Sequence, residues 1–218
     1  MTNLSSVHIG IDLDNTLIDY SPVFSSVGIE LGLLPNHMGD ANKASVRSFM
    51  RSKDTGEKDW MKLQGQVYGR YLEQANLMAG AQQTLLELRR RGLTVSIVSH
   101  KTQFGHYDEQ KIDLRKAALQ WLERHQVFAD TGWGISQQNV HFLPTRDEKI
   151  ARIREIGCTV FIDDLPEVLA HSNFPKGVCR IWFSRDIEEM QISGLRGYAS
   201  WLDIRNHILR SLTKDRQE

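Results

Sequence analysis

Five short apolar runs, rich in β-branched residues, constrain the fold of this chain more than any other feature of its sequence. They are residues 7–13, 93–99, 140–144, 158–163 and 178–183. Runs of this length and nearly continuous apolarity are typical of strands buried on both faces, as in a parallel sheet. From residue 80 onward, amphipathic helical patterns separate the runs. The alternation predicts an α/β fold with a mostly parallel five-stranded sheet.

The long stretch between the first two predicted strands interrupts this alternation. Residues 21–77 are polar, punctuated by glycine and mainly helical in pattern. A single connection from strand to helix needs far less chain. We therefore predict a small α-helical cap at 21–77, inserted into a core made of 1–20 and 78–218. Its basic residues Arg47, Arg51 and Lys53 could face an anionic substrate or form a solvated helix face.

Composition and charge narrow the class of protein. The chain has 27 basic and 27 acidic residues, so its formal net charge is zero. This balance argues against a general nucleic-acid or membrane-surface binder. Neither a signal-peptide pattern nor an apolar stretch long enough to cross a membrane is present, so we expect a cytoplasmic protein without membrane association. Cys158 and Cys179 are expected to be buried thiols in a reducing compartment.

Polar side chains follow three of the predicted strands, at the points where the strands end. The first strand ends in Asp12 and Asp14, the second leads into 99–102, and the fourth ends in Asp163 and Asp164. Ligands of open parallel sheets bind at the carboxyl ends of the strands. We therefore expect these side chains to lie along one edge of the sheet and to form its functional site.

Phosphoryl transfer suits this set of residues. Asp12 and Asp164 can offer oxygen ligands to Mg²⁺, which typically binds through one or two carboxylates and a substrate phosphate. The Ser99 hydroxyl and the Lys149 ammonium, which stands at the start of a helix, can donate to that phosphate. A carboxylate can also act as the nucleophile. Asp14, two residues after Asp12 and on the same face, can move a proton.

Four segments of the chain together resemble the motifs of the haloacid dehalogenase superfamily of phosphohydrolases. Residues 12–16, DLDNT, are similar to the first motif, and 95–99, VSIVS, to the second. Lys149 resembles the third motif and 160–164, VFIDD, the fourth, in the order of the family. The resemblance implies a Rossmann-like, three-layer core, and the insertion at 21–77 takes the place of the family's small helical cap.

The resemblance also implies roles for the acidic residues. Asp12 would be the nucleophile and a ligand of Mg²⁺. Asp14 would be the general acid and base, and its backbone carbonyl would bind the same ion. Asp164 would be the side-chain metal ligand, with Asp163 beside it adjusting charge and water. The implied activity is hydrolysis of a small phosphorylated metabolite.

The remaining implied roles concern the phosphate and the support of the site. Ser99 and Lys149 would bind the transferring phosphoryl group. His100 is a further candidate for phosphate contact, although a surface or hydrogen-bonded histidine is the alternative. Lys101 lies near the same edge and competes with Lys149 for the phosphate. Thr16 would brace the loop that follows the first strand.

Several alternatives stay open from the sequence. Aspartates at strand ends also occur in turns, and Asp163 or Asp164 could cap the helix that follows. The same phosphoaspartate chemistry could serve a phosphomutase or a phosphotransferase. A binding or regulatory module with little activity is the alternative outside enzymes, although it would gain nothing from the repulsion among four clustered carboxylates. The substrate and the oligomeric state are not readable from the sequence.

Overall fold

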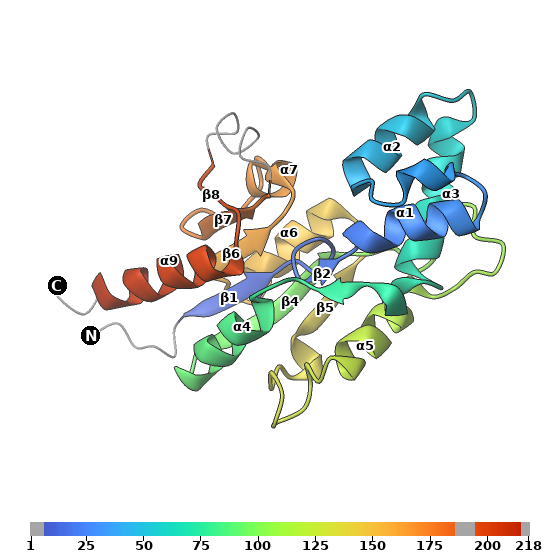
Figure 1. Ribbon diagram of the computed structural model, residues 1–218. Coiled ribbons are helices and arrows are strands. Elements are labelled where there is room, and N and C mark those ends of the chain that lie inside the picture. Colours follow the sequence, from blue (N-terminus) through green and yellow to red (C-terminus); the bar gives the residue numbers. More distant parts are fainter. Residues whose placement is uncertain (1–6, 186–194, 215–218) are drawn as a thin grey trace. The chain divides into compact units, whose positions relative to one another are not determined.

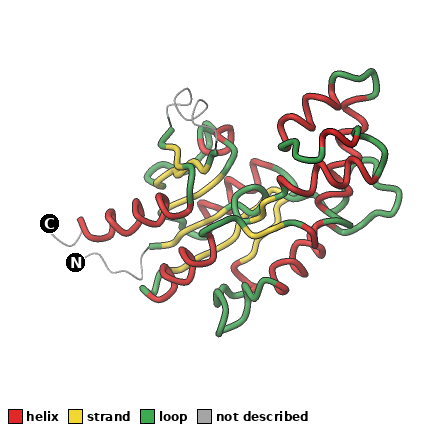
Figure 2. The backbone as a smooth tube through the Cα atoms, viewed as in Figure 1, coloured by secondary structure: helices red, strands yellow, loops and turns green. Residues whose placement is uncertain are grey.

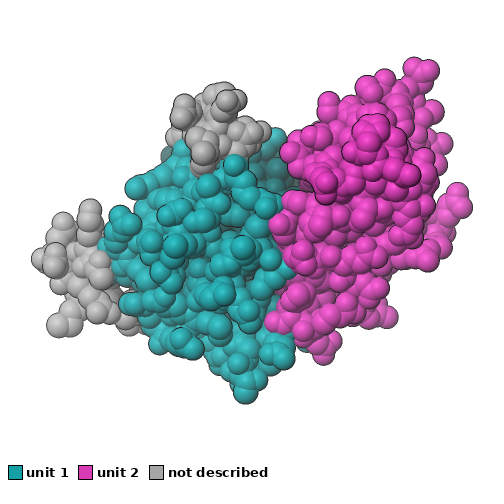
Figure 3. Space-filling view, in the orientation of Figure 1, with its two compact units in different colours: residues 1–17, 77–100, 126–218 teal, residues 18–76, 101–125 magenta. Residues whose placement is uncertain are grey.

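The computed structural model describes residues 7–185 and 195–214 of the chain (Figure 1). These residues divide into two compact units (Figure 3). Unit 1 consists of the described residues within Met1–Leu17, Leu77–His100 and Gln126–Glu218, and unit 2 of Ile18–Asn76 and Lys101–His125. The division differs from the sequence-based boundaries mainly at 101–125, which groups with the helical insertion.

Unit 1 is built on a six-stranded sheet of order β5-β4-β1-β6-β7-β8, and every pairing is parallel. The strands are β1 (His8–Ile11), β4 (Thr94–His100), β5 (Val140–Leu143), β6 (Val160–Asp163), β7 (Cys179–Phe183) and β8 (Gly197–Tyr198). The first five coincide with the five apolar runs. The predicted number of strands is corrected from five to six, because β8 has only two residues and therefore no periodicity to detect.

Helices cover both faces of this sheet (Figure 1). They are α4 (Ala81–Arg90), α6 (Arg146–Glu155), α7 (Pro166–Leu169) and α9 (Trp201–Lys214), with a short 3₁₀ helix at Gln137–Asn139. In β7, Trp182 packs into a buried cluster with residues of α6 and α7. The ring of the next residue, Phe183, lies 6.2 Å from that of Trp201 in α9. Because successive strand residues point to opposite faces, α6 and α7 lie on one side of the sheet and α9 on the other, which confirms the three-layer core.

Close packing between neighbouring strands fixes one residue of β1. A Cβ at Gly10 would lie 2.5 Å from a ring carbon of Phe161 and 2.6 Å from the sulfur of Cys158. Phe161 is fully buried in β6, next to β1. Glycine at position 10 therefore lets this aromatic ring lie against the central strand.

Unit 2 is mainly helical (Figure 2). It contains α1 (Ser21–Glu30), α2 (Lys43–Arg51), α3 (Gly56–Tyr68) and α5 (Leu114–Arg124), with 3₁₀ helices at Asn36–Met38 and Leu72–Gln74. Two short strands, β2 (Ile18–Asp19) and β3 (Asn76–Leu77), pair where the chain enters and leaves the insertion. An aromatic cluster forms its core, in which the rings of Phe24 and Trp60 stack at 5.1 Å and Tyr68 meets Tyr20 edge-on at 4.8 Å.

The helix α5 joins unit 2 through specific contacts. The indole Nε1 of Trp121, itself buried, donates a hydrogen bond to the carbonyl of Ala75 at 3.1 Å. Leu114 lies against Gly69, at the end of α3. The sequence shows the amphipathic pattern of this helix but not which unit its apolar face contacts, because that choice depends on tertiary packing.

Across the residues that the structure describes, no helix has both the length and the apolarity needed to cross a membrane.

Candidate active site

The site is built at the carboxyl end of β1, the strand in which the order of the sheet reverses. The chain passes from β1 outward through β4 and β5, and then returns to β6 on the other side of β1. Asp12 follows β1 directly, and its backbone N–H donates to the carbonyl of Ile162 in β6 at 2.9 Å. The next residue of β6 is Asp163. The register therefore brings the two carboxylates side by side.

Lys149 holds these two carboxylates together. Its ammonium donates to Asp12 Oδ1 at 2.5 Å and to Asp163 Oδ2 at 2.7 Å. The Lys149 side chain is 1% exposed, and those of Asp12 and Asp163 are 7% and 0% exposed. The helix α6 places the lysine there, and its N-cap Thr145 accepts a hydrogen bond from the backbone N–H of Glu148. Because an ammonium has three N–H donors, one donor remains after these two bonds.

Burial and charge shift the pKa values of this ion pair in a consistent direction. Burial raises the pKa of Asp12 to about 7, with Asp163 and Asp14 adding to the effect and Lys149 opposing it. Burial alone would lower the pKa of Lys149, but Asp12 and Asp163 outweigh it and hold that pKa above its ordinary value. The lysine is therefore charged at neutral pH. A further cation beside Asp12 would favour its ionised form.

A metal ion fits the carboxylates of this site. Asp12, Asp163 and Asp164 each present one oxygen, and these oxygens lie within 4.8 Å of one another. Three carboxylates outnumber the single positive charge of Lys149. Oxygen ligands at this spacing suit a hard divalent cation such as Mg²⁺. The expected ligands Asp12 and Asp164 both belong to the cluster. Asp163, for which the sequence indicates only a supporting role, belongs to it as well.

Two buried hydroxyl groups near the site have no hydrogen-bond partner among the described residues. They are Ser99 Oγ and Thr16 Oγ1. Ser99 is 1% exposed and stands near the carboxyl end of β4, next to β1 in the sheet. Burying a hydroxyl group without a hydrogen-bond partner costs free energy, unless a bound ligand supplies that partner. Its position suits the phosphate contact expected of Ser99.

The turn after β1 sets the position of Asp14. Asn15 adopts a left-handed conformation with φ of 60°, which asparagine tolerates better than most residues. The backbone N–H of Leu17 then donates to the carbonyl of Leu13 at 2.9 Å and closes the turn. Asp14 is half-buried, and its charge acts on the pKa values of both Asp12 and His100. The turn thus places Asp14 within electrostatic range of the acidic cluster.

His100 is hydrogen-bonded in a way that limits its use as a phosphate donor. Its Nε2 lies 3.0 Å from the carbonyl of Pro144. Because a carbonyl only accepts, Nε2 carries the proton, and the Nδ1 of the neutral ring is an acceptor. Desolvation lowers the pKa of His100, and Lys149 adds to the shift. His100 would therefore donate to a phosphate through Nδ1 only after it is protonated.

The two candidate lysines have different surroundings. Lys149 contacts the acidic cluster, as described above. Lys101 is 3% exposed, belongs to unit 2, and its ammonium lies 5.3 Å from the centre of the Tyr68 ring. The geometry favours Lys149 as the lysine of the site, because its ammonium donates directly to Asp12 and Asp163.

The N-cap position of the helix after β6 is taken by neither aspartate of the acidic pair. The N-cap of α7 is Leu165, without a side-chain hydrogen bond. Asp163 Oδ1 instead accepts from the backbone N–H of Leu165 at 2.9 Å, which forms a turn ahead of the helix. Asp163 thus has two roles, in this turn and on Lys149.

Two tryptophans that the sequence analysis did not select hold the backbone of the site. Trp201 Nε1 donates to the carbonyl of Thr16 at 3.0 Å, and Trp182 Nε1 donates to that of Asp164 at 3.0 Å. No motif marks these contacts, since they join segments far apart in the chain. An indole donor at the end of a predicted strand or at the start of a predicted helix is the only signal that could have indicated them.

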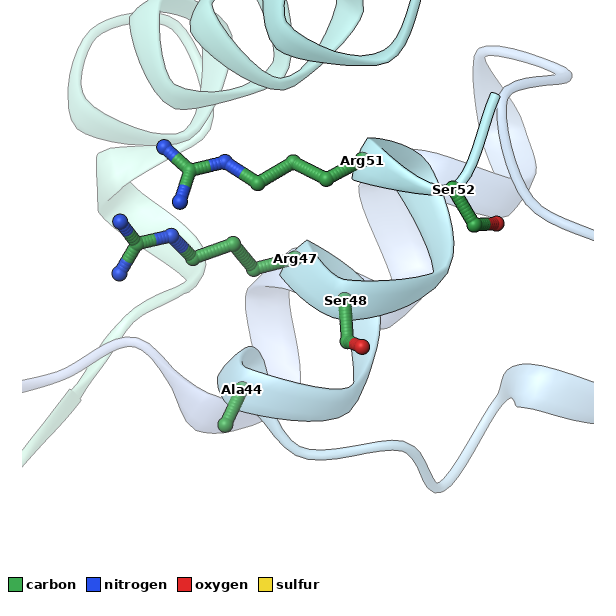
Figure 4. Close-up of a pocket in the computed structure, with 5 residues that line it drawn as sticks. All are labelled: Ala44, Arg47, Ser48, Arg51 and Ser52. Atoms are coloured by element: carbon green, nitrogen blue, oxygen red, sulfur yellow. The ribbon is translucent and has the colours of Figure 1, made fainter.

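Two arginines of α2, Arg47 and Arg51, line an open hollow on unit 2 (Figure 4). Arg47 and Arg51 point in the same direction from successive turns of the helix. Arg51 is paired with Glu57 at 2.5 Å, and Lys53 donates to the carbonyl of Leu33 at 3.0 Å. Arg51 and Lys53 are thus exposed and already have partners within the protein, which fits the interpretation of a solvated helix face.

Comparison with protein families found no family model that matches the chain, and no curated protein is similar to it in sequence. Solved structures do resemble it. A predicted phosphatase from Clostridium acetobutylicum matches with a TM-score of 0.61 and 14% identity, over 94% of this chain and 98% of that one. A haloacid dehalogenase family hydrolase from Deinococcus radiodurans R1, solved with bound phosphate and sodium, matches with a TM-score of 0.57 and 14% identity, over 94% and 96%.

A third similar structure is a predicted phosphoglycolate phosphatase from Haemophilus somnus 129pt. It matches with a TM-score of 0.56 and 15% identity, over 95% of this chain and 100% of that one. The same architecture therefore extends over almost the whole of each chain, although few residues are identical. This chain has the fold of the haloacid dehalogenase superfamily hydrolases.

Proposed function

We propose that this chain is a Mg²⁺-dependent phosphatase of the haloacid dehalogenase superfamily, which hydrolyses a phosphomonoester of a small metabolite. The observation that carries the proposal is the buried contact of Lys149 with Asp12 and Asp163, beside Asp164. Burying three acids, wholly or in part, beside a single lysine costs desolvation free energy when the chain folds. A ligand that brings cations and phosphate oxygens to the same place would offset this cost.

In the proposed mechanism, Asp12 attacks the phosphorus atom of the substrate. Its carboxylate oxygen forms a bond to phosphorus while the bond to the leaving oxygen breaks, and Asp14 gives that oxygen a proton. Lys149 holds Oδ1 of Asp12 and so orients the carboxylate for attack. The result is a phosphoaspartate at position 12 and a free alcohol.

The second half of the proposed reaction returns the enzyme to its starting state. Asp14, now ionised, accepts a proton from water, and the water oxygen attacks the phosphorus. The bond between phosphorus and Asp12 breaks, which releases phosphate. Lys149 and Ser99 donate hydrogen bonds to the phosphoryl oxygens in both steps. Bound Mg²⁺, held by Asp12, Asp164 and the carbonyl of Asp14, would neutralise negative charge on those oxygens.

The test is a panel of small phosphomonoesters assayed with Mg²⁺, with free phosphate and organic product measured together. We expect release of phosphate from at least one ester by the wild type and none by Asp12→Asn. Asp130→Asn is the matched control, because its side chain is fully exposed and lies outside the acidic cluster. Equal activity of wild type and Asp12→Asn would exclude the proposed mechanism. An isomerised or transferred phosphate without free phosphate would instead indicate a mutase or transferase.

A further inference from the structure

A second hollow, of about 350 Å³, opens on unit 2 between the helix α3 and the loop 102–113. Its lining includes Lys58, Lys62 and Lys111 together with Phe104 and Tyr107. None of these residues has a role in the proposed phosphatase reaction. The volume lies at the lower end of the range for small-molecule sites, about 300–1,000 Å³.

The charges around this hollow favour an anion. Lys58 and Lys62 stand one turn apart on the same face of α3, and Lys111 faces the hollow from the loop. Within the described parts of the chain, none of these three ammonium groups belongs to an ion pair. The carboxylate of Asp108 is occupied by the backbone N–H groups of Gln110 and Ile112. Glu109 also lines the hollow, so three ammonium groups stand against the two carboxylates of Asp108 and Glu109, and the lining keeps a net positive charge for a ligand.

Two exposed aromatic rings add a second kind of contact. Phe104 is 41% exposed and Tyr107 is 56% exposed, and both line the hollow. The ammonium of Lys58 lies 5.5 Å from the centre of the Tyr107 ring. A ring that is open to solvent beside a lysine offers a stacking surface for a planar group and a charge for its anionic substituent.

Two residues of the loop adopt a backbone conformation that is unfavourable for their side chains. Tyr107 and Lys111 adopt left-handed conformations, with φ of 59° and 48°. Each such residue costs roughly 1–2 kcal/mol, which glycine would avoid. Neither residue is a glycine or an asparagine, although both positions favour one. Strain of this kind gathers at ligand sites, where the side chain itself is needed.

We propose that this hollow binds a small anion that carries a planar aromatic ring, of the nucleoside monophosphate class. The ring would stack on Tyr107 and Phe104, and the phosphate would meet Lys58, Lys62 and Lys111. The site lies wholly in unit 2, so the proposal does not depend on the phosphatase activity proposed for unit 1.

The test is calorimetric titration of the full chain in EDTA, which prevents metal-dependent turnover. The probes are AMP, ribose 5-phosphate, which lacks the ring, and adenosine, which lacks the charge. We expect saturable binding of AMP and at least tenfold weaker binding of the other two compounds. Ribose 5-phosphate that binds as tightly as AMP would overturn the proposal, because the phosphate alone would then account for binding. Absence of saturable AMP binding would also overturn it.

Variants assign the binding to the hollow. Tyr107→Asn removes the ring but keeps a residue that tolerates positive φ, and it should weaken AMP binding by about 5- to 150-fold. Lys58→Gln is a second variant on the regular helix α3 and should also weaken binding. Lys116→Gln, an exposed lysine of α5 outside the hollow, is the control and should leave it unchanged. AMP binding that is lost in Asp12→Asn but unchanged in Tyr107→Asn and Lys58→Gln would contradict the proposal.

Discussion

At the scale of single residues, the site depends on how one lysine compensates two buried carboxylates. Lys149 contacts Asp12 and Asp163 within hydrogen-bond distance, and all three side chains are almost inaccessible to solvent. Removing one member of a buried ion pair leaves an uncompensated charge and is strongly destabilising. The lysine therefore contributes to the stability of unit 1 as well as to the proposed reaction.

Lys149→Met tests this double contribution. We expect the free energy of unfolding to fall by about 3–5 kcal/mol, because Asp12 and Asp163 would then face each other without a counter-charge. Phosphatase activity should be lost as well. Urea denaturation of the wild type and the variant measures the difference, with Lys116→Met as a control for the loss of a lysine on an exposed helix face. A variant of unchanged stability would contradict the ion-pair geometry.

His8 supplies a second prediction at this scale, for the dependence of stability on pH. Its Nδ1 lies 2.7 Å from the carbonyl of Ile156 and its Nε2 lies 2.8 Å from Ser96 Oγ. Since the carbonyl requires a proton on Nδ1, Nε2 accepts from the serine. Desolvation lowers the pKa of His8 below its ordinary 6.5. The unfolded chain therefore binds a proton at higher pH than the folded chain does.

Acidification should remove the contribution of His8 to stability. As the pH falls from 7.5 to 5.5, the wild type should lose stability relative to His8→Asn, by at most about 1.4 kcal/mol for each pH unit. Asparagine keeps a donor near the position of Nδ1 but does not titrate. The difference between the two proteins is the informative quantity, because the raised pKa of Asp12 acts on both in the opposite direction. A difference that does not change with pH would reject this assignment.

At the scale of elements, two glycines decide how closely the loop 102–113 approaches α3. A Cβ at Gly105 would lie 2.7 Å from the Cα of Gly65, which is a backbone atom that cannot rotate away. A Cβ at Gly65 would meet the Cα of Gly105 and the carbonyl of His106 at 3.5 Å, an ordinary contact. A side chain would therefore clash at Gly105 but could be accommodated at Gly65.

The substitutions Gly105→Ala and Gly65→Ala should consequently have different effects on the free energy of unfolding. Gly105→Ala should cost about 1–3 kcal/mol, because the loop must move away from the helix. Gly65→Ala should be neutral or stabilising by up to about 1 kcal/mol, because alanine favours the helical conformation of α3. Thermal and urea unfolding of both variants provide the comparison. Equal destabilisation by the two substitutions would show that the close approach is not as described.

At the scale of the whole molecule, the sequence predicts the parts of the fold that depend on local pattern. The apolar runs predict the five longer strands of the sheet, and the motifs predict the acidic edge at Asp12 and Asp163. It does not predict β8, which is two residues long, or the grouping of 101–125 with the insertion. Both depend on contacts between distant segments, which leave no periodic signal.

Contacts between distant segments also limit how much of the candidate site the sequence predicts. Residue types and strand ends are sufficient to select Asp12, Ser99 and Lys149 as candidates, because parallel strands bring their carboxyl ends together. They do not show that Lys149 bridges two acids, or that Trp201 holds the carbonyl of Thr16. These contacts join residues that are up to 185 positions apart and depend on side-chain packing in three dimensions.

The central claim is that Asp12 becomes phosphorylated during turnover. The most direct measurement is to quench the reaction of a turned-over ester with acid, reduce the protein with borohydride and map the modified residue by mass spectrometry. Because reduction converts an aspartyl phosphate to homoserine, we predict homoserine at position 12 in the wild type and none in the wild type without substrate. Homoserine at another position, or turnover of the same ester with no modified residue, would contradict the account.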